Sequence, residues 1–197
     1  MTLGVLVVHA GRIRDCTRIA IAGEAIAVIA FIVSVTWPQA IAIGAIGPVA
    51  LGALILALLE VLGSVRFLLG LGVTIVGLAG VSLELAGTVV PVLEGTFVTS
   101  RLFGAGTILV GLWFVGLALV TREAKLFEPE VSSSTIQGAL GLMLVGSSWF
   151  FDTQLSLIVF GISILLVTSL APIFTELREF GLPRKSAQPV ARESMSG

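Results

Sequence analysis

Long apolar stretches separated by short polar or charged segments run through the whole chain. The hydrocarbon core of a bilayer is about 30 Å thick, so a helix rising 1.5 Å per residue crosses it in roughly 20 residues. Six stretches approach this length, which predicts an all-α integral membrane protein with six transmembrane helices in a compact bundle. We expect the spans at about 19–37, 40–59, 67–83, 102–120, 136–151 and 155–174.

The turns between the spans predict three helical hairpins. Pro38 has no N–H to continue a helix and restricts the residue before it, so Trp37–Pro38 is expected to form the turn of the first hairpin. The other two hairpins are centred on residues 87–100 and on Asp152. The fifth span is short, so it must thin the bilayer, extend into flanking residues or be shielded by neighbouring helices.

Basic residues predict the orientation, because Lys and Arg are retained in cytoplasmic loops. With six spans, ten of the eleven Lys and Arg residues fall on one side of the membrane, and only Arg101 falls on the other. Both termini are therefore expected in the cytoplasm. Trp37 and Trp149 would then lie near the outer interface, which indole rings prefer. The ten residues are Arg12, Arg14, Arg18, Arg66, Arg122, Lys125, Arg178, Arg184, Lys185 and Arg192.

Three segments follow from these assignments. Residues 1–18 form a cytoplasmic N-terminal segment, either a short interfacial helix or a flexible terminus. A cleavable signal peptide is not expected, because the apolar stretch Leu3–Val8 is too short for one. Residues 19–174 form the six-helix transmembrane domain. Residues 175–197 form a cytoplasmic tail, whose polar, Pro- and Ser-containing end is expected to be disordered.

Composition supports the membrane assignment and excludes other classes. Of 197 residues, 56% are hydrophobic and 12% charged, whereas soluble domains carry roughly a quarter charged residues. Mean hydropathy is +1.12. A single cysteine, Cys16, excludes a disulfide scaffold, and a net charge of −1 argues against a nucleic-acid partner. The lipid bilayer is the expected partner, and the expected location is the cell membrane.

Catalytic and cofactor chemistry has few candidate residues here. His9 is the only histidine, tyrosine is absent, and one His with one Cys cannot build a zinc site. The sequence has no phosphate-binding loop, no His-Glu-x-x-His motif and no axial haem pair at membrane depth. We therefore expect no enzyme activity, no metal and no cofactor.

Small residues in the second predicted span indicate a helix-packing face. Ala40, Gly44, Pro48 and Gly52 are spaced four apart, so they share one side of a helix. Membrane helices associate by close backbone approach over such residues. Pro48 is also expected to kink this helix. The alternative is that Gly44–Pro48 unwinds into an ion-coordinating break, as in some transporters.

Three similar hexamers begin and end with glycine: Gly72–Gly77, Gly106–Gly111 and Gly141–Gly146. They suggest a repeat or a shared packing device. Glycine-rich helix starts also occur at Gly70–Gly72 and Gly138–Gly141. In this organisation the chain resembles the HdeD-like small membrane proteins, and the resemblance implies six apolar helices paired as hairpins.

Carboxylates at membrane depth are the candidate functional groups, because burying them is costly. Glu24 lies inside the first span without a basic residue within four positions, so it is a possible ion or proton site. Its alternative role is to reach cytoplasmic headgroups. Glu60, close to Arg66, is the second and weaker candidate. Glu84, Glu94 and Asp152 are expected as an acidic set in the outer loops, the longest of which runs from Glu84 to Arg101.

Two functions remain open from the sequence. The first is a non-enzymatic membrane protein with a structural, stress-associated or accessory-subunit role, because the chain is nearly all apolar helix. The second is a small ion- or proton-coupled transporter or channel that uses Glu24, with Glu60 as a possible second group. The transporter would need a homo-oligomer or a membrane-complex partner to build a wide enough path.

Overall fold

The computed structural model describes residues 3–34, 36–95, 101–150 and 165–181. The regular structure of these residues is helical, and they contain no strand. The elements in chain order are α1 (Leu3–Val33), the 3-10 helix η1 (Pro38–Ala45), α2 (Ile46–Val65), α3 (Phe67–Leu93), α4 (Arg101–Glu123), α5 (Pro129–Ser148), the 3-10 helix η2 (Thr168–Leu170) and α7 (Ala171–Glu179).

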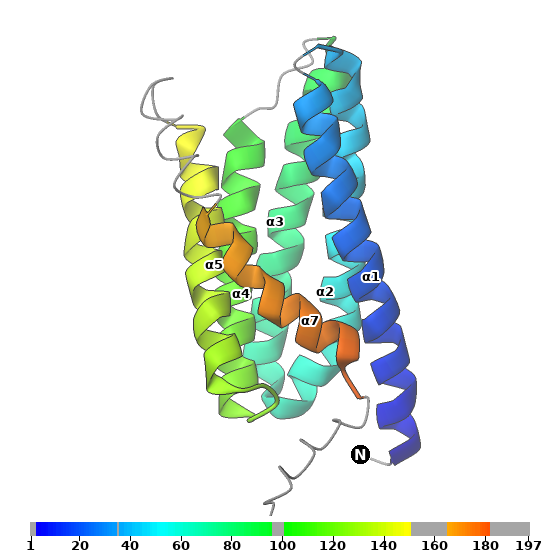
Figure 1. The fold of residues 1–197 in the computed structure, drawn as a ribbon, viewed down its shortest axis with the longest axis vertical. Coiled ribbons are helices and arrows are strands. Elements are labelled where there is room, and N and C mark those ends of the chain that lie inside the picture. Colours follow the sequence, from blue (N-terminus) through cyan, green and yellow to red (C-terminus); the bar gives the residue numbers. More distant parts are fainter. Residues whose placement is uncertain (1–2, 35, 96–100, 151–164, 182–197) are drawn as a thin grey trace, which may run out of the picture.

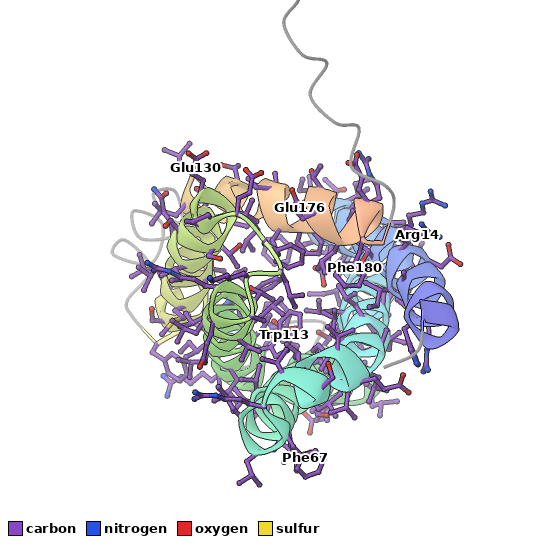
Figure 2. All side chains as sticks on the ribbon, turned by 90° about the horizontal axis from the view of Figure 1, so that it is seen from below. Arg14, Phe67, Trp113, Glu130, Glu176 and Phe180 are labelled. Carbon is purple, nitrogen blue, oxygen red and sulfur yellow. The ribbon has the colours of Figure 1, made fainter. Side chains whose placement is uncertain are left out.

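The five long helices stand side by side and alternate in direction (Figure 1). Each packs mainly against the next one in the chain, so α2 lies between α1 and α3, and α4 lies between α3 and α5. Helices α1, α3 and α5 therefore run the same way. Helix α7 crosses obliquely and contacts both α5 and α1, which places it along the open side of the bundle (Figure 2).

Four helical segments are long and apolar enough to cross a membrane: His9–Val33, Pro38–Val65, Phe67–Leu93 and Arg101–Glu123. They correspond to the first four predicted spans, and helix α5 matches the fifth over residues 136–148. The turn predicted at Trp37–Pro38 is confirmed, because α1 ends at Val33 and Pro38 is the first residue of η1. Residues 155–164 of the sixth predicted span and residues 182–197 lie outside the described part.

The third helix is longer than the span predicted for it. Helix α3 does not stop near Leu83 but continues to Leu93, with Pro91 inside it. The added turns are held by packing on α4: Gly87 lies against the backbone of Phe103, and Gly87, Thr88 and Pro91 are buried. A single carboxylate does not end a helix whose apolar face continues past it, so Glu84 is not a loop residue.

Two other segments predicted outside the spans are also helical. Helix α1 is continuous from Leu3, so residues 3–18 are neither a flexible terminus nor a helix separate from the first span. Helix α5 begins at Pro129, seven residues before the predicted start at Ile136, with Pro129 in the first turn, where its missing N–H costs nothing. With 20 residues, α5 is longer than the short fifth span predicted.

The core forms where α1, α2, α3, α4, α5 and α7 face one another. Trp113 of α4 is fully buried and packs edge-on against Phe114, which in turn contacts Phe174 of α7. Ile173 and Leu177 of α7 are also fully buried. This aromatic and aliphatic filling occupies the middle of the bundle, where Figure 2 shows Trp113 directed into the interior.

Candidate intramembrane carboxyl site

Glu24 lies on α1 at the contact with the beginning of α2. A β-carbon at Gly47 of α2 would lie 3.3 Å from both Cδ and Oε1 of Glu24, so the carboxyl group rests on the bare backbone of that glycine. Glu24 is half-buried. Among the described residues, no hydrogen-bond donor and no cation is paired with its carboxyl group. Since no described arginine pairs with Glu24, its alternative role as the partner of an arginine has no supporting contact here, and the headgroup alternative stays a prediction.

Glu84 lies on α3 and is only 7% exposed. The hydroxyl of Thr107 on α4 and Oε1 of Glu84 form a hydrogen bond of 2.9 Å. One turn further along α3, the buried hydroxyl of Thr88 donates to the backbone carbonyl of Glu84 at 2.9 Å. The expectation that Glu84 belongs to an exposed acidic set is therefore wrong, and this residue is the most deeply buried carboxyl group in the described part.

Glu24 and Glu84 lie at the same level of the bundle. Each precedes the last residue of its helix by nine positions, Val33 in α1 and Leu93 in α3, and these helices run in the same direction. At 1.5 Å per residue, each carboxyl-bearing residue is about 14 Å from its helix end. The negative charges of the two carboxyl groups, when both are ionised, repel each other. Helix η1 contacts both α1 and α3 toward this end of the bundle.

Glycines bring α3 and α4 close enough for Thr107 to reach Glu84. A β-carbon at Gly106 would lie 2.5 Å from the backbone nitrogen of Glu84 and 2.6 Å from the carbonyl oxygen of Gly80. A β-carbon at Gly80 would lie 2.8 Å from the backbone nitrogen of Val110. The two backbones are thus in contact at this crossing, as is typical of small residues between membrane helices.

Glu60, the other predicted candidate, is not brought to this site. It lies 13 residues after Gly47 in α2, about 20 Å along the helix. Its carboxylate pairs with His9 Nδ1 at 2.5 Å and lies 4.0 Å from Arg12 Nη1, and its side chain is 49% exposed. Glu60 therefore links the ends of α1 and α2 at a solvent-accessible position.

Much of the predicted packing face of the second span borders a groove and is not in tight contact with another helix. Gly52 approaches Val81 of α3 at an ordinary van der Waals distance, and a β-carbon at Gly44 would meet nothing within 4 Å among the described residues. Pro48 and Gly52 line an apolar groove of about 320 Å³ between α2 and α3. The close approaches between α1 and α2 are instead at Gly23 and Gly47.

The chain is helical from Gly44 to Pro48 and is not unwound there. It changes from 3-10 to α geometry between Ala45 and Ile46. The alternative of an unwound, ion-coordinating break at this position is therefore wrong. The remaining members of the predicted outer acidic set are Glu94, which is exposed at the end of α3, and Asp152, which lies outside the described residues.

One sequence signal marks Glu84 as buried. The buried positions of α3 recur every three or four residues and are mostly small, which is the pattern of a helix face packed on a neighbour. Glu84 falls on that face, between Val81 and Gly87. The buried positions are Gly70, Val73, Thr74, Gly77, Gly80, Val81, Glu84, Gly87, Thr88 and Pro91.

Within the described ranges, no three His, Cys, Asp or Glu side chains are grouped as they would be to hold a metal ion. Comparison with protein-family models, with curated proteins and with solved structures gives no match. The resemblance to the HdeD-like proteins stays a prediction.

Proposed function

We propose that this chain is a multi-pass membrane protein that couples the movement of a solute or an ion to protonation of an intramembrane carboxyl pair, Glu24 and Glu84. The observation that carries the proposal is the position of the pair: two carboxyl groups from different helices, at one level of the bundle, interacting with each other and without a cation partner among the described residues. Ionisable groups inside membrane helices are costly and are a mark of ion or proton pathways.

The proposed topology has six spans with both termini in the cytoplasm of a cell membrane. Its support is the distribution of basic residues along the described helices. Arg66 lies between α2 and α3, Arg122 and Lys125 lie at and after the end of α4, and all three are at the end of the bundle where α1 begins. Arg101, at the start of α4, lies at the opposite end. This asymmetry is the one that cytoplasmic loops show.

The carboxyl pair has the chemistry that coupling requires. A carboxyl group enclosed by apolar helices exchanges a proton for a cation more readily than it ionises alone, because an unpaired charge is costly away from water. Glu24 is half-buried and Glu84 is buried, so neighbouring helices enclose Glu84 more completely than Glu24. One member is therefore available for exchange while the other is held in place.

A structural or accessory-subunit role is the second candidate. It is favoured by the filled interior of the bundle, where Trp113, Phe114 and Phe174 pack in edge-on contacts. A protein with only this role would carry no ion or proton flux of its own.

The experiment that separates the two is a flux assay in liposomes. Purified protein is reconstituted with an internal pH indicator, and proton entry is measured after a membrane potential is imposed. We expect the wild type to carry flux above protein-free liposomes and Glu24→Gln to fall to that background. The matched control is Glu60→Gln, which removes a carboxylate that is half-exposed and about 20 Å away along α2, and which should leave the flux unchanged.

Wild-type flux no greater than that of protein-free liposomes, under both pH and sodium gradients, would contradict the proposed function and support the structural role. Equal flux in the wild type and in Glu24→Gln would also contradict it. A loss of flux in Glu60→Gln as well as in Glu24→Gln would show that the assay responds to any lost carboxylate.

A further inference from the structure

The hydroxyl group of Thr107 faces two acceptors and has one hydrogen. Its Oγ1 lies 2.9 Å from Glu84 Oε1 and 3.0 Å from the backbone carbonyl of Phe103. A threonine hydroxyl donates one hydrogen bond and accepts up to two. If Glu84 is ionised, Thr107 must donate to the carboxylate, and its contact with the Phe103 carbonyl then has no hydrogen.

A protonated Glu84 satisfies both contacts. Its O–H donates to Thr107 Oγ1, and the Thr107 hydroxyl donates to the Phe103 carbonyl, so every oxygen–oxygen contact contains one hydrogen. The count favours a carboxylic acid at Glu84, because buried polar groups in a helix bundle are generally hydrogen-bonded.

The charges around Glu84 agree with this count. Of the titratable residues on the described elements packed around it, Glu24 is the one that interacts with it, and Glu24 is also acidic. The others lie toward helix ends. Arg101 begins α4, and Arg122 and Glu123 end it, while Glu60 is paired with His9 near the end of α2. The titratable residues of the first half of α1 are His9, Arg12, Arg14, Asp15, Cys16 and Arg18.

Glu24 differs from Glu84 in burial and in hydrogen bonding. It is half-buried, its carboxyl group rests on Gly47, and no donor reaches it from the described residues. No hydrogen bond from another described side chain therefore replaces the proton of Glu24 when it leaves.

We propose that the two members of the pair have different roles: Glu84 is a fixed carboxylic acid that donates its hydrogen to Thr107, and Glu24 is the group that exchanges a proton with water. In each cycle Glu24 releases one proton to water on one side of the membrane and takes up one from the other, while Glu84 keeps its own. Thr107 is a positioning residue. The assignment deepens the proposed function and rests on it for the role of Glu24.

Infrared spectroscopy of the purified protein at neutral pH tests the assignment of Glu84 directly. Exposed carboxyl groups are ionised under these conditions, so a carboxylic-acid C=O band reports a buried protonated group. We expect this band in the wild type and in Glu24→Gln, and we expect Glu84→Gln to lose the component that belongs to Glu84 and to keep only the part that Glu24 contributes when it carries its proton. Thr107→Val should shift the band to higher frequency, and the matched variant Thr107→Ser, which keeps a hydroxyl group, should not.

A band that is absent from the wild type, or that disappears in Glu24→Gln and persists in Glu84→Gln, would overturn the assignment. A wild type with the Glu84 band and without flux contradicts only the proposed function.

Discussion

The indole ring of Trp113 on α4 packs directly on Gly77 of α3. A β-carbon at position 77 would lie 2.6 Å from Cδ1 and 2.8 Å from Cγ of Trp113, and 3.0 Å from Cδ1 of Ile55. The indole is rigid and fully buried, so it cannot turn away from an added methyl group. The two residues set the distance between α3 and α4 in the core.

The contact predicts that Gly77→Ala destabilises the bundle. Overpacking a well-packed site costs about 1–3 kcal/mol, and we expect a lower apparent Tm in detergent, measured by circular dichroism. In a Trp113→Leu background the same substitution should cost less, because the clashing ring is gone. Equal losses in the two backgrounds would show that Trp113 is not what excludes a side chain at position 77.

The crossing of α3 and α4 at the carboxyl site gives a second prediction. Gly106→Ala places a methyl group 2.5 Å from the Glu84 nitrogen and 2.6 Å from the Gly80 oxygen, both of them backbone atoms that cannot rotate away. We expect a loss of about 1–3 kcal/mol in stability. Separation of α3 from α4 should also lengthen the Thr107–Glu84 hydrogen bond, seen as a shift of the Glu84 infrared band.

Gly72→Ala is the matched control for Gly106→Ala. Gly72 is the first glycine of another of the three similar hexamers, and a β-carbon there would meet nothing within 4 Å in the described part. Alanine has a higher helix propensity than glycine, so this variant should be neutral or gain up to about 1 kcal/mol. A Gly106→Ala protein as stable as Gly72→Ala would contradict the close crossing of the two helices.

Much of the helical arrangement was predictable from the sequence because apolar length and periodicity decide where membrane helices form. The candidate site was only half predictable. Glu24 stands out because its neighbours in the chain are apolar, but its partner Glu84 was taken as the end of a span, since a charge is the usual marker of a boundary. The signal that identifies Glu84 is the stripe of small residues that continues past it to Pro91.

Other features depend on contacts between residues distant in the chain. Thr107 becomes a partner of Glu84 only when the α3–α4 crossing places it there, and hydroxyl groups in membrane helices usually bond to their own backbone, as Thr74 does to Gly70. The oblique path of α7 follows from burial of Ile173 and Leu177 across the bundle. Local sequence patterns carry no information on such contacts.

The ion pair between Arg66 and Glu123 is predicted to contribute little to stability, in contrast to the glycine contacts. It joins the α2–α3 turn to the last residue of α4 at a distance of 2.5 Å, but the side chains are 63% and 46% exposed. Water and salt screen such a pair, so Arg66→Ala should change stability by no more than about 1 kcal/mol. Unfolding measured at low and at high salt checks this. A loss as large as that of Gly106→Ala would indicate a buried ion pair.

The proposed topology predicts that Glu94 and Glu128 lie on opposite sides of the membrane. Both are exposed, Glu94 directly after α3 and Glu128 directly before α5, and α4 separates them. The 23 residues of α4 span about 34 Å, which exceeds the hydrocarbon core of about 30 Å. Single-cysteine variants Glu94→Cys and Glu128→Cys, each in a Cys16→Ser background, allow each site to be labelled alone.

A membrane-impermeant maleimide added to intact cells should label Glu94→Cys, and it should label Glu128→Cys only after the membrane is opened. The Cys16→Ser protein without an added cysteine is the control for background labelling. Labelling of both positions from one side would contradict a membrane-crossing α4, because no bilayer would then separate its two ends. The reverse pattern would keep the crossing and invert the orientation, which would show that the basic residues lie on the outer side.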